Sequence, residues 1–174
     1  AQTYFAVQTR RIELIEKRLS DQERLTARQK LSLSEKELSG LIFERMGDNS
    51  GFARIRSKGD QALFGGYTTQ QMKNKLGIPE PRPLADFLPT ITIKAKDFAN
   101  EITQFNVVRD NLKNEVVIGG EHVKNNREVR ELLGRNNIRP ENLPPAEDIK
   151  KVVHKLASEG KKLSKTTRKL KDKT

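Results

Sequence analysis

The chain lacks cysteine and tryptophan altogether, and it is poor in aromatic residues of any kind. Without cysteine it can form no disulfide bond and no thiolate zinc site, and it has no cysteine nucleophile. Only seven Phe and two Tyr are present among 174 residues, so few large side chains are available for a core. The hydrophobic fraction of 34% is matched by a charged fraction of 33%, which is the polar end of the range for globular domains. This composition favours an elongated or modestly cored helical protein.

Long hydrophobic runs are also missing. No apolar run reaches the 18 residues of a membrane span, so we expect a soluble protein without a membrane partner. Ala1 stands where an initiator Met would be, and the residues after it contain no secretory signal. We therefore expect the gene product to extend upstream of Ala1. The absence of cysteine is compatible with a reducing compartment, and we expect a cytoplasmic location.

The chain offers no recognisable catalytic constellation. It has no Ser-His-acid set and no phosphate-binding loop, and its two histidines, His122 and His154, lie far apart in the sequence. We expect both histidines to be surface groups, and we expect no enzyme activity, cofactor or metal. A nuclease remains as an alternative, because Pro140-Glu141 and Asp148-Ile149-Lys150 imitate the Pro-acid and acid-x-Lys pattern of restriction-like enzymes. Such sites need sheet strands to carry the carboxylates, and no sheet is predicted.

The positive charge is concentrated at one end of the chain. The net charge is +11, and from Lys150 onward ten Lys or Arg face only two acidic residues. The first 149 residues carry 24 basic and 21 acidic groups, so the body is nearly neutral. A basic run attracts phosphate backbones by releasing counterions, although a solvated tail has the same composition. The residues that we predict to bind nucleic acid or a partner are Lys161, Lys162, Lys165, Arg168, Lys169 and Lys171.

Two helices are predicted in the first 46 residues. Apolar residues recur at helical spacing from Tyr4 towards Gln29, with no Pro or Gly to interrupt them. The Ser-x-x-Glu spacings at residues 32–35 and 34–37 are typical of a helix start, so we predict a second helix that ends near Met46 and folds back on the first. The apolar side of the first helix contains Tyr4, Phe5, Val7, Ile12, Ile15 and Leu19.

A glycine pair, Gly65-Gly66, follows Phe64 and indicates unusual dihedral angles or a close approach of another element. We expect Phe64 and Tyr67 to be packing residues. A helix over residues 70–76 is predicted next, capped by Thr68 or Thr69 and ended by Gly77. Residues 52–76 would also suit a helix-turn-helix, in which the DNA-facing residues would be Gln70, Gln71, Lys73 and Asn74.

Three prolines between residues 79 and 83 predict an extended connector, which we take as a subdomain boundary. Beyond it we predict helices over residues 90–109, from 121 or 125 to about 136, and from 149 to about 156, with at most a minor strand at 116–118. The basic segment that follows is expected to become helical only against a partner. The predicted fold is all-α and multi-helix, divided into residues 1–78, 79–156 and a basic tail of 157–174.

One motif lies near the N-terminus and reads Tyr4-Phe5-Ala6-Val7-Gln8-Thr9-Arg10-Arg11, followed by Glu13-Leu14. It resembles the central signature of the bacterial DNA damage-inducible protein D family, and it is the most specific of several such motifs. Leu63-Phe64-Gly65-Gly66, Arg127-Glu128-Val129-Arg130 and Arg139-Pro140-Glu141-Asn142-Leu143-Pro144 come in the family's order and at similar separations. The resemblance covers roughly residues 1–156. The residues taken as its structural signature are Tyr4, Phe5, Arg10, Arg11, Phe64, Gly65 and Gly66.

The resemblance implies a role in the bacterial SOS response and a link to the RecA recombinase, whose filaments on single-stranded DNA the family inhibits or disassembles. It also implies an N-terminal DNA-binding domain, like that of phage and baculovirus repeat proteins, which we do not find in this sequence. The expected partners are therefore a RecA filament and single-stranded DNA, and the expected location is the bacterial nucleoid. The alternative is a homodimerisation and effector module of a phage-type transcriptional regulator, with the first helix as the two-fold interface.

Overall fold

The structure is a computed structural model that describes residues 2–47 and 50–171, and within α6 it describes side chains only as far as residue 162. Over this part of the chain it contains six α-helices, two short 3₁₀ turns and no strand. The predicted all-α class is confirmed. None of the helices in the described ranges contains a segment long and apolar enough to cross a membrane.

The chain divides into two compact units. One contains residues 1–26 and 147–174, and the other contains residues 27–146. Helix α1, Gln2–Met46, contributes to both. The proline connector at residues 79–83 lies inside the second unit. The division of the chain into residues 1–78, 79–156 and 157–174 stays a prediction.

The predicted break between two N-terminal helices is wrong, because α1 continues through residues 29–34 without interruption. Leu31, Leu38 and Ile42 are fully buried at spacings of seven and four residues, so the apolar period runs straight across the predicted start. The Ser34 hydroxyl donates to the carbonyl of Leu31, at 3.2 Å, instead of capping a new helix. A capping pattern is only a local signal, and here the continuous burial of one helix face outweighs it.

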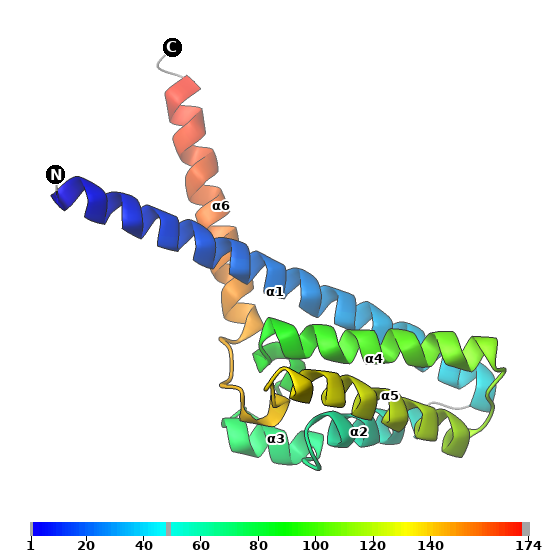
Figure 1. Cartoon of the computed structure of the whole chain (residues 1–174). Helices are drawn as coiled ribbons and strands as arrows, with labels where there is room; N and C mark the ends of the chain where they lie inside the picture. Colours follow the sequence, from blue (N-terminus) through cyan, green and yellow to red (C-terminus); the bar gives the residue numbers. More distant parts are fainter. Residues whose placement is uncertain (1, 48–49, 172–174) are drawn as a thin grey trace. The chain divides into compact units, whose positions relative to one another are not determined.

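Helices α2 (Ser50–Leu63), α4 (Thr90–Arg109) and α5 (Glu115–Arg135) lie side by side in the second unit (Figure 1). They bury two clusters of apolar side chains together with residues 27–46 of α1. The larger cluster includes Leu31, Leu63, Phe64, Met72, Leu88 and Ile93, and the smaller contains Leu38, Ile42, Ile55, Val107 and Ile118.

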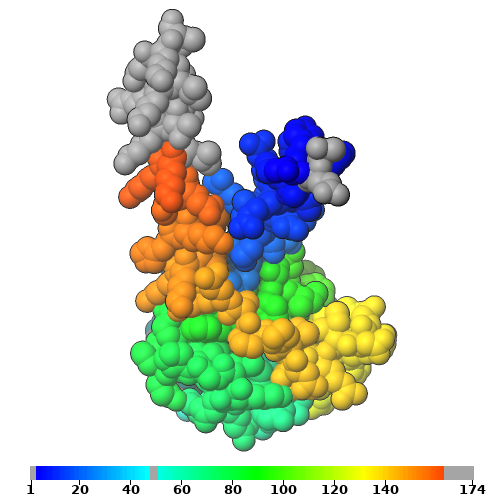
Figure 2. All heavy atoms as spheres, turned by 90° about the vertical axis from the view of Figure 1, so that its left-hand side faces the viewer, coloured from blue at the N-terminus to red at the C-terminus, as the bar shows by residue number. Residues whose placement is uncertain are grey.

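Helix α3, Thr69–Leu76, confirms the predicted capping. Thr68 and Gln71 form a reciprocal capping box, and Gly77 ends the helix in the left-handed conformation with φ 66°. A short 3₁₀ turn, Leu84–Phe87, follows Pro83, and a second one spans Pro140–Asn142. The two segments around α3 and residue 140 lie side by side on the surface of this unit (Figure 2), where Lys75 Nζ is 3.3 Å from Asn142 Oδ1.

The predicted bounds of α4 are confirmed at both ends, but α5 begins earlier than expected. Asn114 caps α5 by accepting a hydrogen bond from the Val117 amide at 3.1 Å. Residues 116–118, for which at most a minor strand was predicted, belong to α5, because a cap at Asn114 commits these β-branched residues to the first turn of the helix.

In the first unit, α6 runs from Ile149 to Lys171. The helix was expected to end near Leu156 and the basic segment to need a partner for helix formation, and the structure corrects both expectations. The apolar repeat at Ile149, Leu156 and Leu163 continues the helix, and no proline interrupts it. Gly160 costs such a helix only about 1 kcal/mol relative to Ala.

Candidate functional site

Three short motifs that are far apart in the sequence meet at one place in the second unit. The Arg130 guanidinium, on α5, donates two parallel hydrogen bonds to the Glu141 carboxylate, at 2.7 and 2.8 Å. It also donates to the carbonyl oxygen of Leu63, at 2.8 Å. The Leu-Phe-Gly-Gly segment, the Arg-Glu-Val-Arg segment and the Arg-Pro-Glu segment are thus joined through one side chain.

Gly65 is required at this junction for two reasons. Its φ of +64° lies in the left-handed region, where the backbone of a residue that carries a Cβ is strained. A Cβ at Gly65 would also lie 2.6 Å from Arg130 Nη2 and 2.9 Å from Arg130 Cζ. The glycine pair therefore has both unusual dihedral angles and a close approach of another element, as predicted. Gly66 also has a positive φ, of +101°.

The Arg130–Glu141 pair is held in its charged form. The hydrogen bonds from Arg130 are the main reason that the pKa of Glu141 lies below its usual value. The same bonds raise the pKa of Arg130. Glu141 is buried and Arg130 is half-buried, so the bidentate pair fixes the end of α5 to the loops around residues 65 and 140.

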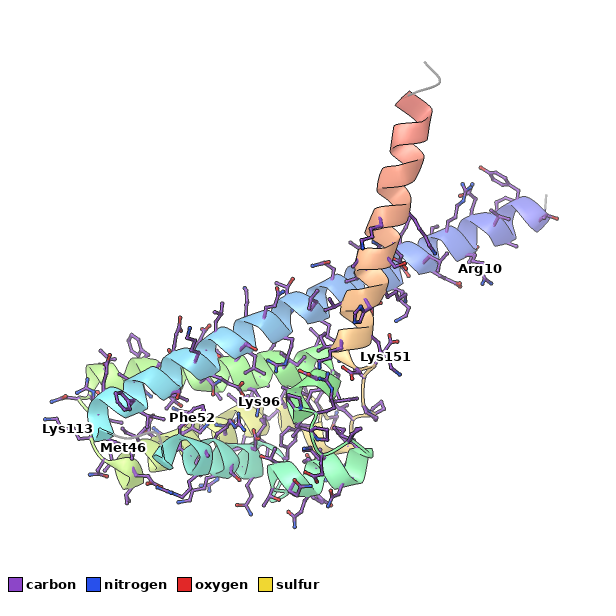
Figure 3. All side chains as sticks on the ribbon, turned by 180° about the vertical axis from the view of Figure 1, so that it is seen from behind. Arg10, Met46, Phe52, Lys96, Lys113 and Lys151 are labelled. Carbon is purple, nitrogen blue, oxygen red and sulfur yellow. The ribbon has the colours of Figure 1, made fainter. Side chains whose placement is uncertain are left out.

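A hollow of about 380 Å³ in the same unit has walls rich in charged residues. Lys96 lies between the helices (Figure 3) and is paired with Asp60, which also accepts a hydrogen bond from the Thr69 hydroxyl at 2.8 Å. Arg28 and Arg82 both contact Asp86, each at 2.8 Å. These charges neutralise one another inside the fold. Sequence reasoning missed them, because single Lys and Asp residues in amphipathic helices usually face solvent.

Phe64 is fully buried and lies beneath the Lys96 ammonium group, with Nζ 6.0 Å from the ring centroid. Its predicted packing role is confirmed. Tyr67 is 39% exposed, and Lys75 Nζ lies 4.7 Å from the centroid of its ring. Both aromatic residues lie in the segment between α2 and α3, and each has a basic side chain close to its ring.

His122 is buried, so its prediction as a surface group is wrong, whereas His154 is exposed as predicted. The Nδ1 atom of His122 is 3.1 Å from the Thr103 hydroxyl. Burial, and to a smaller degree Lys96, lowers the pKa of His122 to about 4, although Asp60 acts in the opposite direction. The ring is therefore neutral at neutral pH. In the described part of the chain, no group of three or more His, Cys, Asp or Glu side chains is arranged to hold a metal ion.

Two alternative sites lose residues on which they depended. Lys73, which was to face DNA in a helix-turn-helix, is buried and donates to the carbonyl of Glu80 at 2.5 Å. Glu141, the acid of the nuclease-like Pro-acid pair, is engaged by Arg130. Asp148 of the acid-x-Lys pattern accepts a hydrogen bond from the Lys150 amide, at 2.9 Å, at the start of α6.

The predicted basic site belongs to α6 in the first unit. Lys161 and Lys162 are exposed there. Lys165, Arg168, Lys169 and Lys171 belong to the same helix, but their side chains lie outside the described residues. Their binding role stays a prediction.

The N-terminal signature residues are on the surface of α1. Tyr4 and Phe5 are 64% and 68% exposed and contact each other edge to face, with 6.0 Å between ring centroids. Arg10 (Figure 3) and Arg11 are exposed as well. Further along, α1 and α6 are connected by two ion pairs, Arg18–Glu159 at 3.7 Å and Asp21–Lys155 at 3.6 Å.

Comparison with known proteins identifies the family. A family model described as the DinD C-terminal domain matches residues 19–152. DNA damage-inducible protein D of Escherichia coli (strain K12) is 28% identical over 169 residues, which cover 92% of this chain and 62% of that relative. The chain thus spans less than two thirds of the relative's length. The matched residues contain the whole Gly65–Arg130–Glu141 junction, and the chain belongs to the DinD family of DNA damage-inducible proteins.

Proposed function

We propose that this chain acts in the bacterial SOS response as a non-enzymatic protein that binds RecA filaments on single-stranded DNA and antagonises them. The observation that carries the proposal is the family match over residues 19–152, which includes the whole second unit and its motif junction. It acts in the cytoplasm, at the nucleoid, and it needs no cofactor.

The proposal divides the work between two parts of the chain. The basic run of α6 attracts the phosphates of the filament's DNA, since Lys161 and Lys162 are exposed and the residues from 150 onward carry a charge of +8. The nearly neutral helical body makes the contacts with the recombinase, where a dense charge of one sign would hinder close packing. Phosphate attraction positions the protein, and protein contacts provide the antagonism.

Deleting residues 161–174 tests this division. Binding to single-stranded DNA should weaken by at least tenfold at low salt, and the slope of log affinity against log salt should become flatter, because up to seven basic groups are removed. Filament disassembly by the same variant should then require higher protein concentrations. The measurements are fluorescence anisotropy across a salt series and filament length by light scattering. A matched variant with every Lys and Arg of the segment changed to Gln separates charge from chain length.

Unchanged binding by the deletion variant would remove α6 from the mechanism. If the full-length chain leaves RecA filaments intact, the proposed function itself is wrong.

The exposed apolar side of α1 favours a second function, as the dimerisation module of a phage-type regulator. Tyr4, Phe5, Ile12, Ile15 and Leu19 are each more than half exposed, and such a helix face suits a second copy of itself. Gel-shift titration on single-stranded, duplex and RecA-coated DNA separates the two functions. Tight sequence-specific duplex binding without filament disassembly would support the regulator.

A further inference from the structure

We propose that the second unit carries a groove along α5 that binds the phosphate backbone of nucleic acid through Lys58, Arg127 and Arg139. This groove is distinct from the basic run of α6. The inference rests on the proposed function, because it supplies a second contact with the filament's DNA.

Two adjoining hollows form the groove. The first, of about 580 Å³, lies between α2 and α5 and is lined by Lys58, Gln61, Ala62, Gly66, Val123, Arg127 and Arg130. The second, of about 420 Å³, lies at the C-terminal end of α5 and is lined by Arg127, Arg130, Glu131, Gly134, Ile138 and Arg139. They share Arg127 and Arg130, so the depression is continuous from α2 to the segment that follows α5.

The cations of this groove differ from those of the charged hollow around Lys96. Lys58, Arg127 and Arg139 are exposed, and their side chains form no ion pair or hydrogen bond with another described residue. Arg130 is held by Glu141, which lines neither hollow, and Glu131 is the one acidic residue among the described residues of the two linings. The groove therefore presents an excess of unneutralised positive charge, whereas Lys96, Arg28 and Arg82 are each paired with a carboxylate.

Two glycines leave room in the groove for a ligand. A Cβ added at Gly66 or Gly134 would meet no atom within 4 Å, so the backbone at both positions faces open space. Gly134 lies in the last turns of α5, where Ala would favour the helix by about 1 kcal/mol. Neither its packing nor its φ requires glycine there. A backbone without side chains lets a bulky ligand approach closely.

The spacing of the basic groups suits a chain of phosphates better than a single anion. From Arg127 to Gly134 the groove follows α5 for seven residues, or about 10 Å, and Lys58 and Arg139 extend it at either end. Guanidinium groups bind phosphate oxygens through two parallel hydrogen bonds. Exposed and separated cations are typical of backbone contacts, which position a nucleic acid without reading its sequence.

The double variant Arg127→Gln/Arg139→Gln in the full-length chain tests the groove. Its affinity for single-stranded oligo(dT) should fall about tenfold at low salt, and the salt slope should decrease by about 1.4, which is 0.7 for each lost contact. The matched control is Lys30→Gln/Lys36→Gln, which removes the same charge from exposed positions on α1 of the same unit. Equal effects of the two double variants would overturn the proposal, because only the total charge would then matter.

A pair of glycine variants tests the groove without changing any charge. Gly134→Gln places a side chain in the second hollow, whereas Gly120→Gln places the same side chain on an exposed part of α5 outside both hollows. Both changes should favour the helix. Only Gly134→Gln should weaken oligo(dT) binding, by about threefold or more, and equal affinities of the two variants would contradict a ligand in the second hollow.

Further experiments identify the ligand of the groove and test the groove and the proposed function independently. Duplex DNA in place of oligo(dT) shows whether the backbone is bound in paired or unpaired form, and either result supports the groove. Polyglutamate serves as a probe for an acidic protein. If Arg127→Gln/Arg139→Gln loses polyglutamate binding but keeps oligo(dT) binding, the groove binds an acidic protein and the proposal of a nucleic-acid site is overturned. If DNA binding depends on the groove but the chain does not disassemble filaments, the groove is supported and the proposed function is refuted. If both double variants disassemble filaments equally well, the proposed function is supported and the groove is refuted.

Discussion

At the scale of single residues, the motif junction depends on atoms that no other side chain could replace. Arg130 uses its planar guanidinium to hold the Glu141 carboxylate and the Leu63 carbonyl at the same time. A Lys at this position would lose the bidentate geometry. Gly65 leaves the space that the guanidinium tip occupies.

We predict that Gly65→Ala destabilises the protein by about 3 kcal/mol. Roughly 1–2 kcal/mol comes from placing a Cβ at positive φ, and the rest from displacing Arg130 from its buried partner. Gly77→Ala is the matched control, because Gly77 has nearly the same φ, +66°, and open space at its Cβ. It should cost only the backbone part. Urea unfolding of both variants measures the difference, and equal losses would show that the Arg130 contact carries no stability.

His122 should make the protein sensitive to mild acid. The folded protein binds the His122 proton only near pH 4, whereas the unfolded chain binds it near the usual pKa of 6.5. Between these values the unfolded state holds more protons, so the free energy of unfolding falls as the pH is lowered from 6.5 to 4, by about 3 kcal/mol. Glu141 acts at lower pH, since its pKa lies below the usual value.

Chemical denaturation across this pH range, compared between the wild-type chain and two variants, checks the assignment. His122→Asn should flatten the dependence between pH 6.5 and 4 even if it lowers the overall stability. His154→Gln should leave the dependence as it is, because His154 is exposed. A pH profile that is the same in His122→Asn as in the wild-type chain would contradict a buried neutral imidazole.

At the scale of elements, the continuity of α1 is the main difference between expectation and structure. The sequence around Ser32 and Ser34 contains good capping patterns, but both serines lie in the interior of α1 and not at the start of a helix. The buried residues on both sides of the serines belong to the two core clusters of the second unit. The helix is therefore continuous because apolar neighbours bury it on both sides of the serines.

Leu33→Pro distinguishes one helix from two. If a helix began after Ser32, proline would occupy its first position, where it is well tolerated. Inside the continuous α1, proline removes a backbone hydrogen bond and should cost about 3 kcal/mol. Leu33 is 61% exposed, so Leu33→Ala should change stability by less than about 0.5 kcal/mol and serves as the control. Thermal unfolding followed by circular dichroism measures both, and a proline variant as stable as the alanine variant would argue for a break.

At the scale of the whole molecule, charge is distributed in two ways. The sequence places most of the excess positive charge from Lys150 onward. The fold of the second unit adds a smaller basic surface by bringing Lys58, Arg127 and Arg139 to the same depression. A region whose formal charge is close to neutral can thus still attract phosphate locally, because its acids are partly consumed in pairs such as Asp60–Lys96 and Asp86–Arg28.

The sequence by itself determined the helical class, the bounds of α4, the caps of α3 and the special backbone at Gly65 and Gly66. These features follow from local rules, since apolar period, capping residues and left-handed glycines act over a few positions. Only the tertiary structure decided that α1 is continuous, that His122 and Lys73 are buried, and that Arg130 meets Glu141. Such contacts join residues far apart in the sequence, such as Arg130 and Leu63, which are 67 positions apart. Burial depends on which faces the packed helices cover. The groove along α5 has the same origin, because its basic residues come from α2, α5 and the segment after α5.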